Sequence, residues 1–179
     1  SGYEEARLIY LGVLQALDVY DKKILLIDIG GGSTEFLTGE KGNVKFSNSI
    51  KLGAVRLTEK FFSDGKYTKE NIENARLHVR SLINPIVRSL KKESYDIIIG
   101  TSGTITNLGS IIYCKSSTED VSLFNFNNYK YTDTELNDAV KTILSYDNAA
   151  VIKKIEGLDS DRADIITAGA IILEQIFKE

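Results

Sequence analysis

The chain has 179 residues, of which 42% are hydrophobic; this suffices for one domain with a full core but not for two independent domains. It carries 22 Lys and Arg against 25 Asp and Glu, a net charge of −3 without a basic cluster, which disfavours a nucleic-acid surface. The single cysteine, Cys114, excludes an intrachain disulfide and makes the cytoplasm the default compartment, and no apolar run approaches the roughly 20 residues of a membrane helix.

The first half of the chain predicts one helix followed by three strands. Apolar residues recur at helical spacing from Ala6 to Leu17, and Ser1 and Glu4 stand in the S-x-x-E relation of a capping box, so a helix should begin almost at residue 1. A continuous β-branched and leucine run predicts a buried strand over 24–29. Two further extended segments are expected over 33–38 and 44–52, joined by hairpin-turn residues at 39–43.

The second half predicts mainly helices around one more strand. A long helix is expected over 69–92, which Pro85, the only proline, should kink or divide. The other expected elements are a buried strand over 95–99, an apolar helical segment at 105–112, a Ser- and Asn-rich loop over 116–131, and helices over 133–144, 148–155 and 161–177. This order predicts a single α/β domain of packed layers, with a site at the carboxyl ends of the strands.

The strongest functional motif is Asp28-Ile29-Gly30-Gly31-Gly32-Ser33-Thr34-Glu35, between two predicted strands. Three glycines at a turn let the backbone approach a ligand and point consecutive N–H groups at phosphate oxygens, so Gly30 to Ser33 are candidate phosphate-binding residues. The motif fits neither the P-loop pattern nor the dinucleotide-binding pattern, because no helix follows it. A glycine hairpin without a ligand is the alternative.

Two carboxylates flank this motif. Asp28 lies near the end of the first predicted strand and Glu35 near the start of the next. Carboxylates beside a phosphate loop would repel the substrate unless a cation or a proton neutralises them, so both residues are candidate ligands for Mg²⁺ or candidates for acid/base work.

A second motif, Gly100-Thr101-Ser102-Gly103-Thr104, follows the fourth predicted strand and opens a helix. Free N–H groups and the helix dipole favour phosphate at such a helix N-terminus, which makes Gly103 and Thr104 candidate contacts. An ordinary strand-to-helix turn with a Ser or Thr cap is the alternative.

Other charged residues suggest structural roles when taken by themselves. Glu4 fits the capping-box acid and Glu5 a solvated residue. Gly169, in the middle of the last predicted helix, costs about 1 kcal/mol against alanine, which indicates close packing, the favoured interpretation, or the close approach of a ligand. His78 is the only histidine, so a zinc site is not expected.

Five segments in this order resemble the exopolyphosphatase/guanosine pentaphosphate phosphatase family: SGYEEARLIYLGV, LLIDIGGGSTEF, KLGAVRLTEKFF, IIGTSGTITNL and DRADIITAGAIIL. The resemblance spans nearly the whole chain, and the two glycine motifs together are far more specific than either alone. It implies a ribonuclease H-like fold of the actin-like ATPase superfamily, in which a mixed sheet with helices packed on it forms each of two lobes. Residues 1–179 would be the second lobe.

The resemblance also implies roles for particular residues. Glu5, in the EEAR motif, would be the base that activates water, contrary to its structural interpretation above. Asp28 and Glu35 would bind Mg²⁺ or position water, while Gly30, Gly31, Gly32, Ser33, Gly103 and Thr104 would contact phosphate. The implied reaction is attack of water on a terminal phosphoryl group of polyphosphate or guanosine pentaphosphate.

The resemblance further implies that the family's first lobe and any helical C-terminal region lie outside this sequence. The absence of methionine, including at position 1, agrees with a segment of a longer protein. We therefore expect the isolated chain to fold but to be weak or inactive, and to associate through the exposed face with its first lobe or as a homodimer. The alternatives are a lobe of an ATP-dependent kinase, and a non-catalytic sensor of guanosine polyphosphates or filament lobe.

Overall fold

The computed structural model describes residues 2–117, 121 and 124–179 of the chain. Its first half contains α1 (Gly2–Ala16), β1 (Ile24–Ile29), β2 (Thr34–Glu40), β3 (Asn43–Ile50), α2 (Ala54–Phe61) and α3 (Lys69–Leu90). Its second half contains β4 (Ile97–Thr101), α4 (Gly103–Ser116), α5 (Asp133–Leu144), α6 (Ala149–Ile152), a 3₁₀ turn (Ser160–Arg162) and α7 (Ile166–Lys178). The order of strands and helices is therefore that of an α/β domain, as the sequence predicts.

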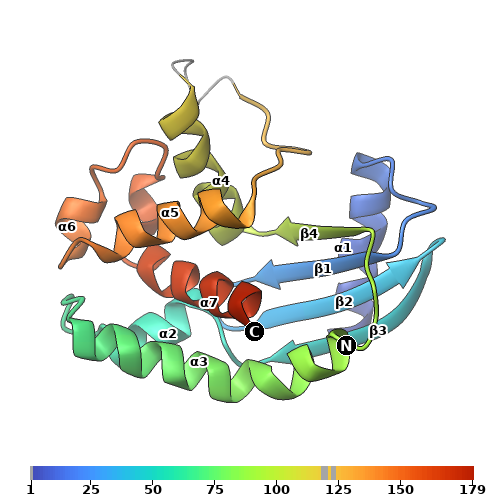
Figure 1. Ribbon diagram of the computed structural model, residues 1–179, viewed down its shortest axis with the longest axis horizontal. Coiled ribbons are helices and arrows are strands. Elements are labelled where there is room, and N and C mark those ends of the chain that lie inside the picture. Colours follow the sequence, from blue (N-terminus) through green and yellow to red (C-terminus); the bar gives the residue numbers. More distant parts are fainter. Residues whose placement is uncertain (1, 118–120, 122–123) are drawn as a thin grey trace.

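The four strands form one mixed sheet in the order β3-β2-β1-β4 (Figure 1). The hairpin strands β1, β2 and β3 pair antiparallel, which confirms the three connected strands expected from the sequence. β4 pairs with β1 in parallel and lies at the edge of the sheet. The carboxyl ends of β1 and β4 consequently lie side by side.

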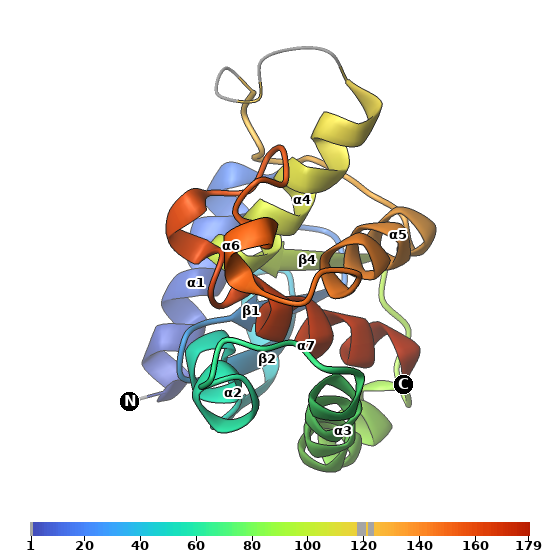
Figure 2. The same ribbon diagram turned by 90° about the vertical axis from the view of Figure 1, so that its left-hand side faces the viewer.

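Helices cover both faces of the sheet (Figure 2). Alternation along β1 sends Ile24 and Leu26 toward α1, where they form a small core with Tyr10. Ile27 and Ile29 point the other way, into a larger core shared with α2, α3, α4, α5 and α7. The continuous apolar run of β1 thus reflects burial on both faces, as expected for a central strand.

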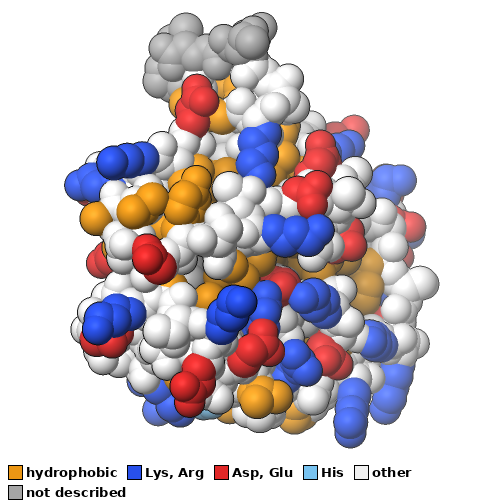
Figure 3. Space-filling model, turned by 60° about the vertical axis from the view of Figure 1, so that its left-hand side comes forward, with side chains coloured by type: hydrophobic (Ala, Val, Ile, Leu, Met, Phe, Trp, Pro, Cys, Tyr) orange, Lys and Arg blue, Asp and Glu red, His pale blue; other side chains and the backbone are white. Residues whose placement is uncertain are grey.

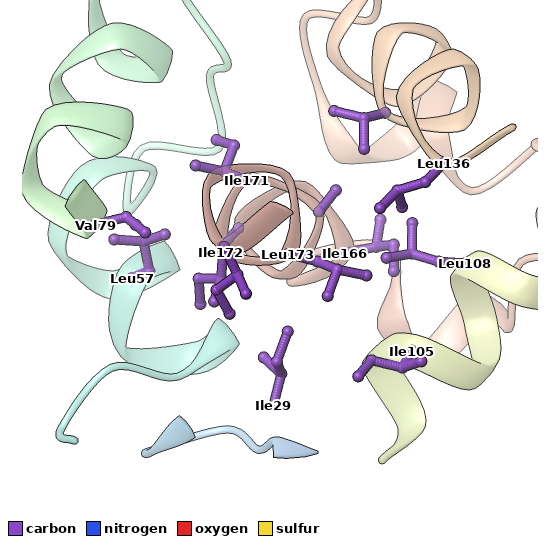
Figure 4. Packing of buried hydrophobic residues seen from close by; sticks show 14 of the residues in the cluster. Ile29, Leu57, Val79, Ile105, Leu108, Leu136, Ile166, Ile171, Ile172 and Leu173 are labelled. Carbon is purple, nitrogen blue, oxygen red and sulfur yellow. The ribbon is translucent and has the colours of Figure 1, made fainter. Parts of the chain in front are cut away.

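Helix α7 is the centre of the larger core (Figure 4). Every residue from Ile166 to Ile176 is buried, with side chains of α2 and α3 on one side of the helix and those of α4 and α5 on the other. Small residues at 168–170 allow the neighbouring helices to approach closely. A helix buried all round is a core helix, and α7 accordingly fixes the position of every element packed on it.

Several predicted boundaries are wrong. Of the two effects expected of Pro85, division of the helix is wrong, because α3 runs without a break from Lys69 to Leu90. The fourth strand begins at Ile97, and of its five residues only Ile99 is buried, since an edge strand lacks a neighbour on one side. Helix α6 spans only Ala149–Ile152. Ser1, to which the capping box was assigned, lies outside the described residues.

Two further differences concern segments next to the site. Helix α2 was not predicted at all, and α7 begins at Ile166, five residues after the expected start at Asp161. The charged segment before α7 instead forms a 3₁₀ turn, which the side chain of Asp159 caps by accepting a hydrogen bond from the N–H of Asp161. Among the described residues, no helix is long and apolar enough to cross a membrane.

A buried ion pair joins α3 to α7. Glu174 is 5% exposed and accepts hydrogen bonds from Arg76 at 2.8 and 2.9 Å and from Lys178 at 2.6 Å. Burial alone would raise the pKa of Glu174, but the hydrogen bonds from these two cations outweigh that effect and hold the pKa below its ordinary value. A depressed carboxyl pKa stabilises the fold above the pKa of the unfolded chain, and this contribution is lost as the pH falls through the folded value.

We predict that Glu174→Gln lowers the free energy of unfolding by about 3 kcal/mol at pH 7, because it leaves Arg76 without its buried counter-charge. The difference from the wild type should begin to shrink as the pH falls below about 4.5, where the unfolded carboxyl group binds its proton, and should vanish once the pH has passed the lower pKa of the folded protein. Urea unfolding of the wild type and of Glu174→Gln between pH 7 and pH 3 measures this difference in unfolding free energy. A difference that stays constant with pH would contradict this role of the ion pair.

Candidate active site at the carboxyl ends of β1 and β4

The parallel pairing of β1 with β4 brings the two glycine motifs together. Asp28 is the register partner of Thr101, so the loop that follows β1 and the loop that follows β4 leave the sheet at the same edge. The sequence predicted both loops but not their adjacency. A site at the carboxyl ends of neighbouring parallel strands is the arrangement expected of α/β sheets.

A row of polar side chains crosses the sheet at this edge. Asp28 lies opposite Glu35 in the β1–β2 pair, and Glu35 lies opposite Ser49 in the β2–β3 pair. With Thr101 on β4, the row reads Thr101, Asp28, Glu35, Ser49 from one side of the sheet to the other. Directly paired residues share one face, which here is the face covered by α1.

Hydroxyl groups bond both carboxylates in the row. The Oγ1 of Thr101 donates to Oδ2 of Asp28 at 2.5 Å, and the Oγ of Ser49 donates to Oε1 of Glu35 at 2.8 Å. The Cβ atoms of directly opposed residues are about 5 Å apart, and like charges in that relation repel. The two predicted metal-ligand candidates are thus placed together, in an arrangement that favours a bound cation.

The loop after β1 is a tight turn with unused backbone donors. The N–H of Gly30 donates to the carbonyl of Ser33 at 2.9 Å, which closes the turn. Within the described residues, the N–H groups of Gly31, Gly32 and Ser33 donate no hydrogen bond. Consecutive backbone N–H groups at such a turn form a concave site for an anion.

Helix α2 supports this loop from behind. The N–H groups of Ala54 and Arg56 donate to the carbonyls of Gly30 and Gly31 at 2.9 and 3.1 Å. Gly53 allows this approach, because a Cβ atom at that position would lie 2.3 Å from the carbonyl oxygen of Gly31. The unpredicted helix therefore fixes the shape of the predicted loop.

The second loop has a strained serine at its centre. Ser102 has a φ of 94°, in the region that favours glycine, and it precedes the first residue of α4, Gly103. Its hydroxyl is buried and has no hydrogen-bond partner among the described residues. Strain and an unsatisfied polar group are characteristic of functional loops.

Thr104 is placed differently from the other candidate phosphate ligands. It is 3% exposed, and Gly169 of α7 packs against its side chain: a Cβ atom on Gly169 would lie 2.4 Å from Cγ2 of Thr104. The side chain of Thr104 therefore faces the core, and the group it can offer a ligand is its backbone N–H in the first turn of α4. The same contact confirms that Gly169 serves close packing.

Two arginines that the sequence did not single out lie against the loops. The Nε of Arg56 donates to the carbonyl of Gly32 at 3.1 Å. The guanidinium of Arg162 lies over Gly103, where a Cβ atom would be 2.3 Å from its Cζ. The side chain of Arg162 makes no hydrogen bond or ion pair with any other described residue. The sequence could have indicated a role for them, because Arg56 lies in the KLGAVR segment and Arg162 in the DRAD segment, and both segments carry the family resemblance.

The remaining candidate, Glu5, belongs to α1, which packs against β2 and β3. The side chain of Glu5 lies outside the described part of the structure, so its role as a base stays a prediction. Among the described residues, no group of three or more His, Cys, Asp and Glu side chains is suited to hold a metal ion. Asp28 and Glu35 still fit Mg²⁺, which takes one or two carboxylates and completes its shell with water or phosphate oxygens.

A mixed sheet with helices on both faces, and two glycine loops at the carboxyl ends of its parallel strand pair, defines the fold as ribonuclease H-like, of the actin-like ATPase class. Within that class, the chain belongs to the Ppx/GppA phosphatase family, whose model matches residues 1–179. The predicted fold and family are both confirmed.

Solved structures agree with this assignment. The chain is similar to an exopolyphosphatase from Cytophaga hutchinsonii, with 24% identity and a TM-score of 0.82, covering 99% of this chain and 56% of that one. It is also similar to the Ppx/GppA family member of Aquifex aeolicus, with 25% identity and a TM-score of 0.78, covering 98% of this chain and 54% of that one. The chain thus spans about half the length of these relatives.

The contacts of two glycines predict opposite effects of the same substitution. Gly53→Ala should cost about 1–3 kcal/mol of stability, because its Cβ would meet the backbone of Gly31 and Gly32. Gly103→Ala should be neutral or slightly stabilising, because its Cβ would meet only the end of the Arg162 side chain, which can move aside. Thermal or urea unfolding of the two variants tests this; equal losses would contradict the packing described for the loops.

Proposed function

We propose that this chain is one lobe of a phosphohydrolase that removes the terminal phosphate from inorganic polyphosphate, guanosine pentaphosphate or both. The observation that carries the proposal is the convergence of two glycine loops and an opposed carboxylate pair at one edge of the sheet. Family membership supports phosphatase chemistry. Similarity to an exopolyphosphatase supports a linear chain of phosphates as substrate.

The backbone of the two loops would hold the phosphoryl oxygens. The N–H groups of Gly31, Gly32 and Ser33 would bind one phosphate, and those of Gly103 and Thr104, in the first turn of α4, would bind a second. Hydrogen-bond donors that are fixed in place before the reaction stabilise the charge that develops on the transferred group. The support of the first loop by α2 and of α4 by α7 provides that rigidity.

Arg56 and Arg162 would add positive charge beside the two loops. On the face shown in Figure 3, Lys and Arg side chains are interspersed with Asp and Glu, so recognition of a polyanion depends on local groups. A guanidinium can bond phosphate oxygens bidentately, and each loop has one beside it. Arg162 has no acidic partner among the described residues, which leaves its charge for a ligand.

The carboxylate pair would hold a divalent cation. Like charges on directly opposed residues repel, so the Asp28–Glu35 pair favours a dication. When bound, Mg²⁺ would neutralise phosphate charge and polarise the phosphorus–oxygen bonds. The residues themselves supply hard oxygen ligands, directly or through water.

Glu5 would act as the general base. A carboxylate on the first turns of α1 would accept a proton from the water that attacks the terminal phosphorus, and the shortened phosphate chain would leave. Because the chain spans 54–56% of its solved relatives, the remaining lobe would complete the cleft, and the isolated chain would bind phosphate chains with little or no turnover.

The test is phosphate release from polyphosphate and from guanosine pentaphosphate, with Mg²⁺, by a protein that joins this chain to the missing lobe. We predict that Glu5→Gln lowers kcat by about 10²–10⁴ with little change in substrate affinity, because a general base contributes to the chemical step and not to binding. The matched control is Glu4→Gln, one residue away on the exposed side of α1, which should keep full activity.

Each alternative predicts a different result. Unchanged release by Glu5→Gln would remove Glu5 as the base. Binding of guanosine polyphosphates without release of phosphate by the complete protein would favour a sensor, and binding that requires adenosine would favour a kinase lobe.

A further inference from the structure

Both carboxylates of the row accept a hydrogen bond from a side chain that is distant in sequence. Thr101 donates to Asp28 across 73 residues of chain, and Ser49 donates to Glu35 across 14. Each donor is the register partner of its acceptor on the next strand outward, so the carboxylates lie inside the row and the hydroxyls lie at its two ends.

From this arrangement we propose that Thr101 and Ser49 are positioning residues for a divalent cation held by Asp28 and Glu35. The inference rests on the proposed function, since it concerns the same site. The terminal torsions of Asp and Glu have broad energy wells, so their carboxylates need an external contact to fix their orientation. Partners bonded to the ligands themselves are the usual means by which proteins orient a metal site.

The chemistry of the two donors fits a cation site. A hydroxyl orients a carboxylate without adding charge, whereas an arginine or lysine in its place would cancel the charge that attracts a dication. Each hydroxyl bonds one oxygen of its carboxylate from the outer side of the row. Each bond restricts the rotation of its carboxylate, and with it the directions in which the second oxygen can point.

The positioning role is better supported for Thr101 than for Ser49. Its β-branched side chain has few rotamers in a strand, and it is half-buried, whereas Ser49 is exposed on the edge strand β3. Thr101 also directly precedes Ser102 and Gly103, and Asp28 lies two residues before Gly30. The Thr101–Asp28 hydrogen bond therefore ties the bases of the two phosphate loops together and sets the cation's place relative to both.

The test measures binding of Mn²⁺, a paramagnetic substitute for Mg²⁺, to this chain by electron paramagnetic resonance and calorimetry. We expect Thr101→Val, which keeps the shape but removes the hydroxyl, to weaken Mn²⁺ binding by about 10- to 100-fold. Thr101→Ser should restore affinity to within about threefold of the wild type, and Ser49→Ala should weaken it by a smaller factor, about threefold. Unfolding curves establish that each variant is folded.

Two matched variants control for the loss of a hydroxyl elsewhere. Ser47→Ala makes the same change two residues before Ser49 on β3, and Thr58→Val makes it in α2, where the hydroxyl bonds the carbonyl of Ala54. Both should bind Mn²⁺ like the wild type.

The outcomes separate this inference from the proposed function. If Asp28→Asn abolishes Mn²⁺ binding while Thr101→Val binds like the wild type, the positioning role is wrong and the cation site stands. If Thr101→Ser is as weak as Thr101→Val, the hydroxyl is not responsible and the inference is also wrong. If the wild type does not bind Mn²⁺, or if Asp28→Asn binds it as well as the wild type does, the proposed cation site is wrong. The positioning role is then wrong as well.

Discussion

The parallel pairing of β1 with β4 is the constraint on which the rest of the site depends. Strands that run in the same direction end at the same edge, so the glycine loop after β1 and the loop that opens α4 face one another. The same register sets Thr101 beside Asp28, while the β1–β2 hairpin sets Asp28 beside Glu35. An antiparallel β4 would have sent the second loop to the opposite edge and separated the two halves of the proposed phosphate site.

The site also depends on close packing behind each loop. Gly53 lets α2 approach the first loop, and Gly169 lets the buried helix α7 approach Thr104 at the start of α4. Both contacts hold backbone N–H groups in place and leave the side chains of Arg56 and Arg162 beside them. Rigid donors around a carboxylate pair suit phosphoryl transfer, in which the enzyme acts mainly by positioning groups and stabilising charge.

Local sequence patterns predicted much of this fold because helices, strands and turns depend largely on interactions between residues that are close in sequence. The run over 24–29 predicted the bounds of β1 correctly, and the glycine motif correctly placed Asp28 and Glu35 on the two strands that flank the turn. Non-local features could not be predicted in this way. The partners Thr101 and Ser49 depend on strand register, and the exposure of β4 depends on its place at the sheet edge, which its apolar residues do not reveal. Helix α2 was missed because only eight residues carry its pattern.

The most direct test of the account is a crystal structure of this chain with Mg²⁺ and imidodiphosphate, a pyrophosphate analogue that resists hydrolysis. We expect one phosphoryl group on the N–H groups of Gly31, Gly32 and Ser33, and a cation about 2.1 Å from an oxygen of Asp28 or Glu35, or joined to it through one water. An analogue bound away from both loops, or a cation bound only by other carboxylates, would contradict it.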